Sequence, residues 1–597
     1  MRRASPRAML PPAPFVLLDD ARADGAPARL YSAPAAVIEA RSPDEVAPAL
    51  AELRAAVAAG RHAAGFLSYE AGYALEPGAG PALHPPTPLL WFGLFDGFAE
   101  VPDPAALLPD PAGAWVGAPQ PEVSRGDYDA MIARVQTLIA AGDIYQANLT
   151  FRAMVPFAGD PPALYAAVRA RAKAGWGALV AMGRETLLSF SPELFFDLAD
   201  GRITCRPMKG TARRIADPAL DAAAAAALAA DGKQRAENLM IVDLMRNDLS
   251  RVAAPGSVAV PELFAVEHYP TVHQMTSTVT AALDPARDGV DVLAALFPCG
   301  SITGAPKLRA MQVIGEVERS PRGPYTGAIG SIDAPGAAQF NVAIRTMLVD
   351  GAGRATIGLG GGIVAESRAD AEWDEALAKG DFLTHDAPRF DLIETMAFDP
   401  EEGVLRVEAH LARMKASAEA LGFAFDRHDT RNELQAATFR LRRAARIRLL
   451  AARTGRIAIE IGPLPAPRAA PLEVAIVPLP VAPGDFRLRH KTSDRDFLDR
   501  ARAAAGTDEV AFAGPDGSLT EGSFTTIFVE RDGTLVTPPL ARGLLPGVLR
   551  AELIAEGRAV EGDLAPADLT DGFFMGNALR GLMPAVVAVA KSEPRPL

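Results

Sequence analysis

The chain has little cysteine. Only Cys205 and Cys299 occur among 597 residues, far apart in the sequence. Neither a disulfide framework nor a paired-cysteine metal motif can be built from them. A reducing compartment is the simplest setting for such a chain, so we expect a cytoplasmic protein.

Long hydrophobic runs are also missing. Apolar residues make up 49% of the chain, yet no stretch reaches the roughly 18 uncharged apolar residues that span a bilayer. The Ala-rich run 222–230 is far too short. The basic start, residues 1–7, is followed by prolines at 11, 12 and 14, which is not typical of a signal peptide. We therefore expect no membrane segment.

An excess of positive charge is absent as well, because the net charge is −13. This balance argues against nucleic acid as the main partner. It leaves room for a small anionic substrate, since local arginines and lysines set the field within a pocket.

The length implies at least two domains. We expect short strands and one helix, near 43–59, in residues 1–120, with the Pro-rich stretch 107–121 as a connection. Residues 125–383 alternate strand and helix signals irregularly, and their length suits one large α+β layered unit. A polar linker, 384–389, precedes a second α+β block at 390–597, which shares no motif with the first.

Two acidic helices are predicted in the first block. Apolar spacing in 233–248 indicates a helix whose Glu237 either faces a pocket or lies on the surface. In the run 371–379, Glu372 and Glu375 share one helix face, with Lys379 four residues further on. One glutamate from each helix would suit Mg²⁺, which also takes substrate oxygens and waters. An ordinary surface Glu–Lys pair is the alternative.

Three further sequence segments contain glycines or polar residues that could contact a ligand. The glycines at 360–362 allow close backbone approach to a ligand, or form a plain bulge. The loop 300–307 enters a helix at Pro306. Residues 340–347 are strand-like, and Arg345 within them is either paired structurally or holds a substrate carboxylate.

Taken in order, these strings resemble the chorismate-utilising enzymes over about 125–383, a family expected to fold as a two-sheet α/β sandwich. The start of the chain, at 68–73, is similar to the same family's N-terminal region. The motifs are Ser191-Pro192-Glu193, 206–211, 237–248, His273, 300–307, 324–327, Arg345, 360–362 and 372–379.

The resemblance implies a magnesium site and a substrate site. Glu237 and Glu375 would coordinate Mg²⁺, with Glu372 acting through water. Position 234 is Gln where many relatives have an acid, so this side of the site departs from the family pattern. The substrate-binding residues implied are His273, Thr303, Tyr325, Arg345, Gly361, Gly362 and Lys379.

Lys209 points to one branch of the family. Anthranilate synthases usually carry a small residue at this position, whereas aminodeoxychorismate synthases carry a lysine and use it as a nucleophile. By that resemblance Lys209 would attack C2 of chorismate, Glu193 would protonate the departing C4 hydroxyl, and ammonia would then add at C4. Both cysteines lie within the chorismate motifs, so we expect ammonia to come free or from a separate glutamine amidotransferase subunit.

The second block contains Lys491 and, thirty residues later, Glu521. A pyridoxal phosphate enzyme needs a lysine that bonds to the cofactor, an acid facing its ring nitrogen and a phosphate cup. A lone lysine is otherwise an ordinary solvated side chain. These residues, together with 394–395, 410–414, 545–550 and 577–578, resemble fold-type IV pyridoxal phosphate enzymes.

That resemblance covers about 390–590 and implies pyridoxal phosphate held by Arg413, Lys491, Glu521, Val548, Leu549 and Asn577. The motifs do not separate aminotransferases from aminodeoxychorismate lyases. Fusion to the first block favours a lyase that consumes its product, with Lys491 taking the C4 proton as pyruvate leaves. Relatives commonly dimerise, so a homodimer through this block is plausible.

The sequence therefore predicts a bifunctional enzyme that converts chorismate to 4-aminobenzoate. One alternative is an anthranilate or isochorismate synthase fused to a branched-chain or D-amino-acid aminotransferase. Another is a binding or regulatory subunit with one inactive half.

Overall fold

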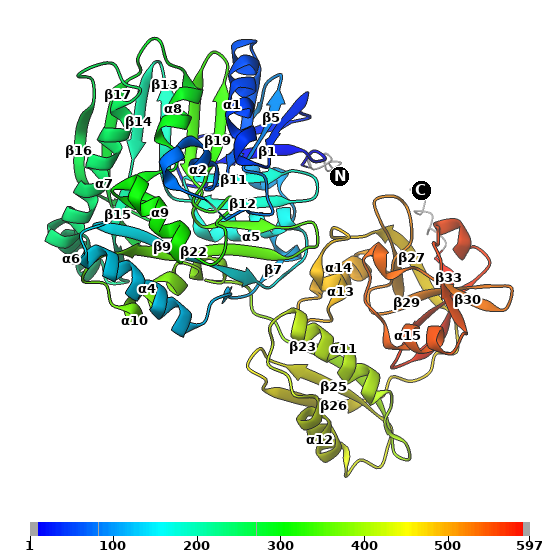
Figure 1. Ribbon diagram of the computed structural model, residues 1–597. Helices are drawn as coiled ribbons and strands as arrows, with labels where there is room; N and C mark the ends of the chain where they lie inside the picture. The colour runs from blue at the N-terminus through cyan, green and yellow to red at the C-terminus, as the bar shows by residue number, and fades with distance from the viewer. Residues whose placement is uncertain (1–9, 82, 270–271, 589–597) are drawn as a thin grey trace. The chain divides into compact units, whose positions relative to one another are not determined.

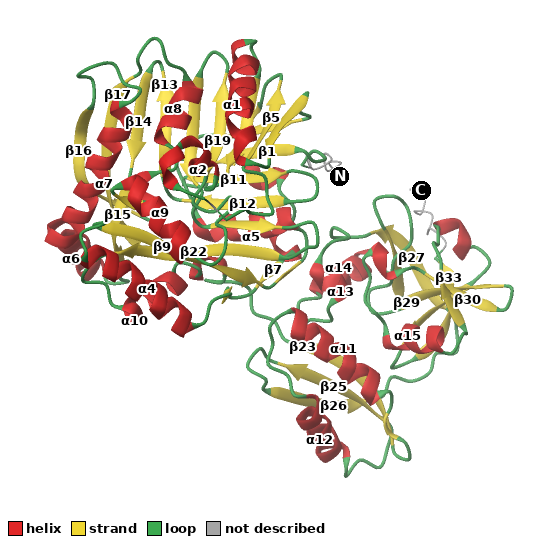
Figure 2. Cartoon of the chain, in the orientation of Figure 1, coloured by secondary structure: helices red, strands yellow, loops and turns green. Residues whose placement is uncertain are grey.

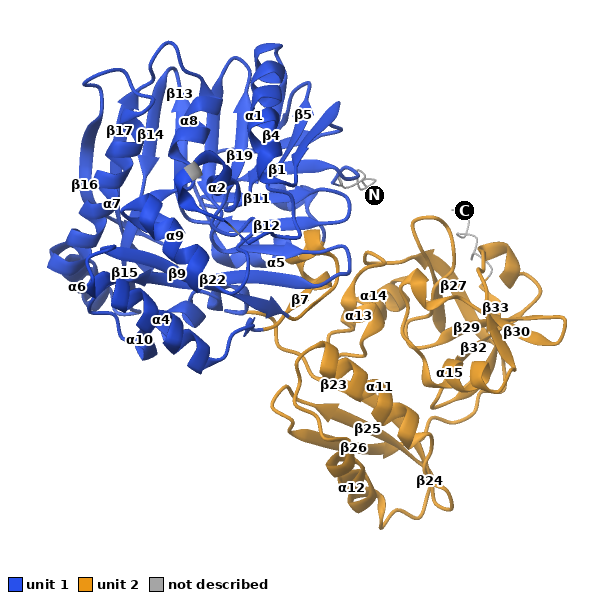
Figure 3. Cartoon of the chain, in the orientation of Figure 1, with its two compact units in different colours: residues 1–109, 118–155, 165–386 blue, residues 110–117, 156–164, 387–597 orange. Residues whose placement is uncertain are grey.

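Helices and strands alternate throughout the computed structural model, which describes residues 10–81, 83–269 and 272–588 (Figures 1 and 2). The basic segment 1–7, expected to carry no signal peptide, lies outside these residues. The chain divides into two units: unit 1 contains 1–109, 118–155 and 165–386, and unit 2 contains 110–117, 156–164 and 387–597 (Figure 3). Within the described residues no helix is both long and apolar enough to cross a membrane.

The first sheet of unit 1 has strand order β18-β9-β22-β21-β12-β11-β1-β2-β6, with β8 beside β9, and is antiparallel. Its central strands are buried, as expected for a layer inside a sandwich. The strands are β1 (Phe15–Asp19), β2 (Ala28–Ser32), β6 (Ala99–Val101), β8 (Gln120–Pro121), β9 (Gln146–Val155), β11 (Trp176–Ala181), β12 (Thr186–Ser191), β18 (Gly304–Ala305), β21 (Thr346–Val349) and β22 (Ala355–Ile363).

The second sheet of unit 1 has order β15-β17-β14-β13-β20-β19-β4-β5-β3, with β16 beside β17. The expected two-sheet architecture is thus confirmed. The strands are β3 (Ala36–Ala40), β4 (His62–Leu67), β5 (Leu90–Phe95), β13 (Leu194–Ala199), β14 (Arg202–Arg206), β15 (Met208–Arg213), β16 (Ala259–His268), β17 (Val272–Ala282), β19 (Ala328–Asp333) and β20 (Ala337–Val342).

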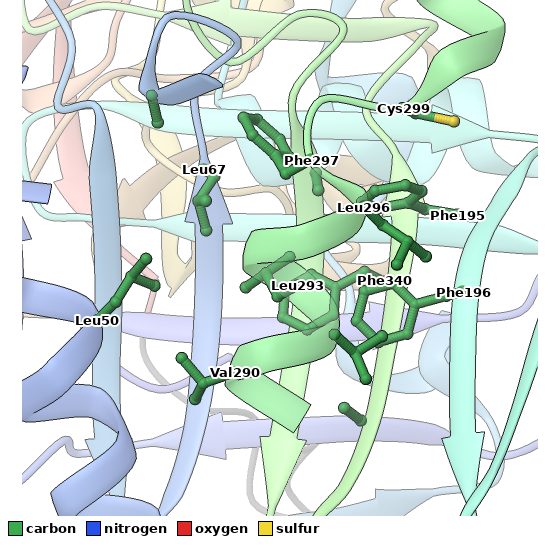
Figure 4. Close-up of a cluster of buried hydrophobic side chains, with 14 of the residues drawn as sticks. Leu50, Leu67, Phe195, Phe196, Val290, Leu293, Leu296, Phe297, Cys299 and Phe340 are labelled. Atoms are coloured by element: carbon green, nitrogen blue, oxygen red, sulfur yellow. The ribbon is translucent and has the colours of Figure 1, made fainter. Parts of the chain in front are cut away.

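The helices expected near 43–59, 233–248 and 371–379 are present, and capping explains where two of them begin. Ser42 and Glu45 form a capping box, and the Asp231 side chain accepts the Gln234 N–H. Figure 4 shows Leu293 and Leu296 gathered with Phe340 in the main core. The helices before residue 390 are α1 (Pro43–Ala58), α2 (Ala71–Leu75), α3 (Pro104–Leu107), α4 (Arg125–Ala140), α5 (Pro161–Ala172), α6 (Pro218–Ala230), α7 (Gly232–Ser250), α8 (Gly289–Leu296), α9 (Lys307–Val317) and α10 (Ala369–Ala378).

The segment 340–347 is not one strand, so that prediction is wrong. β20 ends at Val342 in the second sheet and β21 begins at Thr346 in the first. The chain changes sheets at Arg345, whose φ of +50° is a left-handed conformation that is rare outside glycine. Continuous apolar character hides such a crossing, because both sheets bury these residues.

Unit 2 contains a four-stranded antiparallel sheet and a seven-stranded mixed sheet with three parallel pairings. The expected α+β character is confirmed. The elements are β23 (Leu392–Asp399), β24 (Gly403–Val404), β25 (Ala445–Ala451), β26 (Ile457–Pro463), β27 (Leu472–Pro478), β28 (Glu509–Ala513), β29 (Thr526–Arg531), β30 (Thr534–Thr537), β31 (Ala559–Glu561), β32 (Phe573–Asn577), β33 (Gly581–Val587), α11 (Val407–Ala420), α12 (Arg427–Thr438), α13 (Phe486–Arg489), α14 (Asp496–Ala505) and α15 (Val548–Ala555).

Two segments from early in the chain complete unit 2. β7 (Trp115–Val116) pairs with β10 (Phe157–Ala158), and Trp115 is buried in the same core as Leu392 and Met414. The Arg453 guanidinium lies 5.0 Å from the Trp115 ring centroid. The stretch 107–121 is therefore more than the connection its Pro and Gly content suggested, because its tryptophan fills a core far along the sequence.

Candidate active sites

In unit 1, Glu193 lies where the chain passes from β12 to β13, next to the crossing at Arg345. The Val342 N–H donates to the Glu193 carbonyl at 3.1 Å, and the Phe190 N–H donates to the Arg345 carbonyl at 3.1 Å. Two crossings between the sheets therefore lie side by side, and each carries a predicted site residue.

The Glu193 side chain is buried, and Ser301 Oγ donates to its Oε1 at 2.7 Å. Burial raises the pKa of this carboxyl to about 7, although Ser301 and Lys209 act in the opposite direction. A carboxyl with that pKa holds a proton at neutral pH and can release it, which is what a general acid requires.

Lys209 extends from β15 toward the glycine strand β22. A Cβ built on Gly362 would lie 3.5 Å from the Lys209 Nζ, so the absent side chain leaves room for the amine. Burial and the neighbouring Lys379 lower the pKa of Lys209, against the pull of carboxylates that include Glu193. This environment increases the fraction of nucleophilic neutral amine.

The acidic side chains of α10 gather near Gly361. A Cβ at Gly361 would lie 3.4 Å from Glu372 Oε2 and 4.0 Å from Glu375 Oε1. Lys379 Nζ lies 2.9 Å from Glu375 Oε1 and donates to the Gly360 carbonyl at 2.9 Å. The Glu–Lys pair is therefore real, but it lies over the glycine strand rather than on an isolated helix face.

The same carboxylates bear on a metal site. Burial raises the pKa of Glu237, and Glu372 and Glu375 raise it further by repulsion. Among the described residues no group of three His, Cys, Asp or Glu side chains converges closely enough to hold a metal alone. Glu237 and the two α10 carboxylates are close enough to repel one another, and a cation that takes its remaining ligands from substrate and water would relieve that repulsion.

Tyr325 and Arg345 offer contacts for an anionic ligand. A Cβ at Gly358 would lie 2.0 Å from the Tyr325 ring, so the ring packs directly on the glycine strand. Burial lowers the pKa of Arg345, and no described carboxylate lies within ion-pair distance of it. Of the two interpretations of Arg345, the structure favours the one in which it remains available to a ligand.

Two predicted substrate residues are not brought into this group. His273 is buried, with Nε2 2.9 Å from Asp221 Oδ1 and Nδ1 2.7 Å from His268 Nδ1, so both ring nitrogens are occupied. Thr303 is fully buried, and its hydroxyl donates to the Cys299 carbonyl at 3.2 Å. Ser301, two residues earlier, reaches the site instead. Which hydroxyl of a short loop faces the cavity depends on its backbone path, which spacing does not reveal.

Sequence reasoning also missed Gln146, the first residue of β9. Its side chain is 1% exposed, and its Nε2 would lie 2.4 Å from a Cβ at Gly362. A single buried glutamine carries no sequence signal, because its place beside Lys209 depends on the pairing of β9 with β22.

In unit 2, Lys491 follows α13 and is held by β23. The Ile393 N–H donates to the Lys491 carbonyl at 2.9 Å, and Leu392 bridges to Thr492. Burial lowers the pKa of the Lys491 amine to about 7, partly opposed by Glu394. A largely neutral amine at physiological pH suits bond formation to a carbonyl carbon.

Glu394 organises one side of this site. Arg413 Nε and Nη2 donate to its two oxygens at 2.8 and 2.6 Å, and His410 Nδ1 lies 2.6 Å away. Burial opposes ionisation of Glu394, yet Arg413 and His410 hold its pKa well below the usual range. Arg413 also donates to the Pro546 carbonyl at 3.0 Å, which ties it to the loop before α15.

Glu521 carries an unused acceptor. The Leu545 N–H donates to Oε2 at 3.1 Å, while the buried Oε1 has no partner among the described residues. Burial raises the pKa of Glu521 to about 7, and nearby Arg495 lowers it in part. An orphaned buried carboxylate oxygen fits a protonated ring nitrogen of a bound cofactor.

The N-terminus of α15 provides an anion site. Gly547 precedes Val548 and Leu549, whose N–H groups lie in the first turn, where helical partners are lacking. Asn577 accepts the Leu579 and Arg580 N–H groups at 3.0 and 2.9 Å. A Cβ at Gly547 would lie only 2.9 Å from Thr526 Oγ1, so a side chain there would meet this hydroxyl. The first-turn N–H groups are what suits this region to a cofactor phosphate.

Comparisons with known proteins follow the same division. Residues 13–385 match the family described as chorismate binding enzyme, and residues 391–587 match amino-transferase class IV. Both resemblances inferred from the motifs are therefore confirmed, and a class IV region implies pyridoxal phosphate.

Individual relatives cover part of the chain. Aminodeoxychorismate synthase component 1 of Salmonella typhimurium is 43% identical over 266 residues, which are 45% of this chain and 58% of that protein. Anthranilate synthase component 1 2 of Haloarcula marismortui is 39% identical over 43% of this chain and 48% of its own length. The chain thus spans about half the length of these curated relatives, 58% of the first and 48% of the second.

A solved structure covers more of unit 1. Anthranilate synthase component I from Streptococcus pneumoniae matches 64% of this chain and 95% of its own, with TM-score 0.52 and 25% identity.

Proposed function

Because this chain belongs to the chorismate binding enzyme family and carries an amine at position 209, we propose that it makes 4-aminobenzoate from chorismate in two steps. Unit 1 replaces the C4 hydroxyl with an amino group, and unit 2 removes pyruvate. Lys209, beside Gly362 with a lowered pKa, is the observation that carries the proposal.

In unit 1 each residue has a proposed task. Arg345, Lys379 and Tyr325 bind the carboxylates of the substrate. The neutral Lys209 amine forms a bond to ring C2 as the C4–O bond breaks, and Glu193 supplies the proton that lets the hydroxyl leave as water. Ammonia then bonds to C4 and the Lys209–C2 bond breaks, which restores the amine.

A magnesium ion is proposed at the carboxylates of Glu237 and Glu375, with Glu372 acting through water. The repulsion that raises the pKa of Glu237 supports this assignment. At these carboxylates a magnesium ion would supply Lewis-acid polarisation of a substrate carboxylate and of the ring conjugated to it.

Ammonia is proposed to come from a separate glutamine amidotransferase subunit. Both cysteines of the chain are buried inside unit 1, where neither is placed as an accessible nucleophile. Burial raises the pKa of the Cys299 thiol to about 12, which leaves it inert at neutral pH.

In unit 2 we assign the lyase step. Pyridoxal phosphate bound here would draw electrons away from ring C4 of the amino intermediate. Lys491 takes the proton from C4, the C3–O bond breaks, and pyruvate departs as the ring becomes aromatic. Arg413, Asn577 and the first turn of α15 would hold the cofactor phosphate, and the unpaired oxygen of Glu521 would accept from its ring nitrogen.

Product identification tests the whole proposal. Purified protein is incubated with chorismate, Mg²⁺, ammonium and pyridoxal phosphate, and the products are separated by chromatography. We expect 4-aminobenzoate and pyruvate. Formation of 2-aminobenzoate would refute the assignment of unit 1, and accumulation of 4-amino-4-deoxychorismate without 4-aminobenzoate would refute that of unit 2.

A further inference from the structure

Gln146 is a buried amide that the proposed reaction does not yet use. It is the first residue of β9 and pairs with Ala305 of β18. Its side chain therefore lies against the C-terminal end of the glycine strand β22, at Gly362. Its side chain is 1% exposed, and Oε1 has no hydrogen-bond partner among the described residues. Buried amide oxygens are nearly always paired, so an orphan here indicates a partner that the resting contacts do not supply.

The Lys209 amine lies close to this amide. One point, the position that a Cβ of Gly362 would occupy, lies 2.4 Å from Gln146 Nε2 and 3.5 Å from Lys209 Nζ. A side chain at 362 would collide with the amide, so glycine at this position lets the amide and the amine both approach the same point. A half-turn of the carboxamide exchanges its nitrogen and oxygen and brings the acceptor toward the amine.

We propose that Gln146 is a positioning residue for Lys209: its carboxamide oxygen accepts an N–H of the amine and directs the nitrogen lone pair into the space above Gly362. The inference rests on the proposed role of Lys209 as nucleophile. When a fixed acceptor holds an N–H of the amine, the long lysine side chain loses rotational freedom before the reaction. Less entropy is then lost in reaching the reactive orientation, which lowers the activation free energy.

A neutral acceptor suits this task. The charged groups that act on Lys209 are Lys379, Glu193, Glu237 and Glu375. A further carboxylate in contact with the amine would favour its ammonium form, which has no lone pair to donate. An amide orients the amine without adding that charge.

Two substitutions test the role, with Gln339→Ala as the matched control, because Gln339 is a half-buried amide of the same unit that binds Arg29 and Asp197. Gln146→Ala should lower kcat for chorismate amination at least ten-fold, with KM within about three-fold and an unchanged melting temperature. The control should stay within two-fold of the unsubstituted protein in both constants.

Gln146→Glu should shift the pH at which Lys209 reacts with an amine-labelling reagent, acetic anhydride, upward by about one unit or more, as followed by mass spectrometry of the Lys209 peptide. This readout needs no turnover, so it separates failure of this inference from failure of the proposed function. Unchanged labelling in Gln146→Glu, or kcat within two-fold in a folded Gln146→Ala, would overturn the inference.

Discussion

At the scale of single residues, each unit places a lysine in a site that favours its neutral form. Burial and Lys379 act on Lys209, and burial acts on Lys491. Each lysine is accompanied by a buried carboxyl whose pKa is raised to about 7, Glu193 in one unit and Glu521 in the other. Perturbed groups gathered in this way are typical of reacting sites.

Replacement of Lys209 by Ala removes the proposed nucleophile. We expect formation of aminodeoxychorismate to fall by at least about 10³-fold, while the absorbance of pyridoxal phosphate bound to unit 2 is kept. Chromatography and absorbance spectroscopy measure the two effects. Lys173→Ala, at an exposed position of unit 1, is the control and should change neither. Full turnover by Lys209→Ala with unchanged products would end the case for covalent attack.

The raised pKa of Glu193 predicts a pH dependence. A general acid must be protonated, so amination should fall as the pH rises through about 7, where Glu193 loses its proton. The rate is measured at a constant concentration of free ammonia, so that ammonium titration does not contribute. Glu193→Gln should lower the rate about 10²–10⁴-fold and remove that limb of the profile. A limb that persists in Glu193→Gln would assign it to another group.

Replacement of Lys491 by Ala should stop the pathway between the two units. We expect 4-amino-4-deoxychorismate to accumulate and 4-aminobenzoate output to drop by at least about 10²-fold, because no base remains for the C4 proton. Lys415→Ala changes an exposed lysine of the same unit and serves as control. Undiminished 4-aminobenzoate from Lys491→Ala would count against the lyase assignment.

At the scale of elements, the glycine strand β22 is the surface on which the first site is built. Tyr325, Lys379, Lys209 and Gln146 each approach a position where a side chain would stand. The sequence pointed to the glycines at 360–362 as a place of close approach, and the contacts agree. Gly358 was not singled out, although a side chain there would make the shortest of these contacts, 2.0 Å to the Tyr325 ring.

Gly358→Ala tests this surface. The new Cβ would stand 2.0–2.4 Å from the atoms of the Tyr325 ring, so the ring must move. We expect KM for chorismate to rise about ten-fold or more, since a displaced ring no longer lines the substrate space. Gly351→Ala, in the turn before β22, meets only ordinary contacts of 3.5–4.0 Å and is the matched control. Equal KM values for the two variants would exclude a role of the Tyr325 ring in binding.

Elements with strong periodicity were predictable, and crossings between sheets were not. The helix that carries Glu237 follows from the apolar spacing of 233–248, and the helix that carries Glu375 follows from the shared face of Glu372 and Glu375. The break at Arg345 does not, because residues on both sides are buried in different sheets and look alike in sequence. The same limit applies to Thr303 and His273, whose hydrogen-bond partners are set by the local backbone and by neighbouring polar groups rather than by the motif.

At the scale of the whole molecule, the two units are not consecutive pieces of chain. Residues 110–117 and 156–164 belong to unit 2, although they lie inside the region that matches the chorismate binding enzymes. Family boundaries at 385 and 391 therefore do not mark where the second core begins.

Trp115→Ala should destabilise unit 2 selectively. The indole is 5% exposed and packs in that core, and truncation of a buried tryptophan costs about 3–5 kcal/mol. We expect the bound-cofactor absorbance to be lost at a lower temperature, with chorismate amination retained up to its former limit. Phe439→Ala removes an aromatic ring that is 78% exposed and is the control. Equal thermal loss in both variants would show that Trp115 contributes nothing to the core.

The strands of Trp115 and Phe157 also have a consequence for folding during synthesis on the ribosome. They leave the ribosome long before Leu392 or Met414, the residues that bury Trp115, have been translated. At roughly 5–20 residues per second, these apolar side chains wait on the order of tens of seconds without their partners. During that interval the side chains of Trp115 and Phe157 are available to non-native apolar contacts, which are the usual origin of misfolding in large chains.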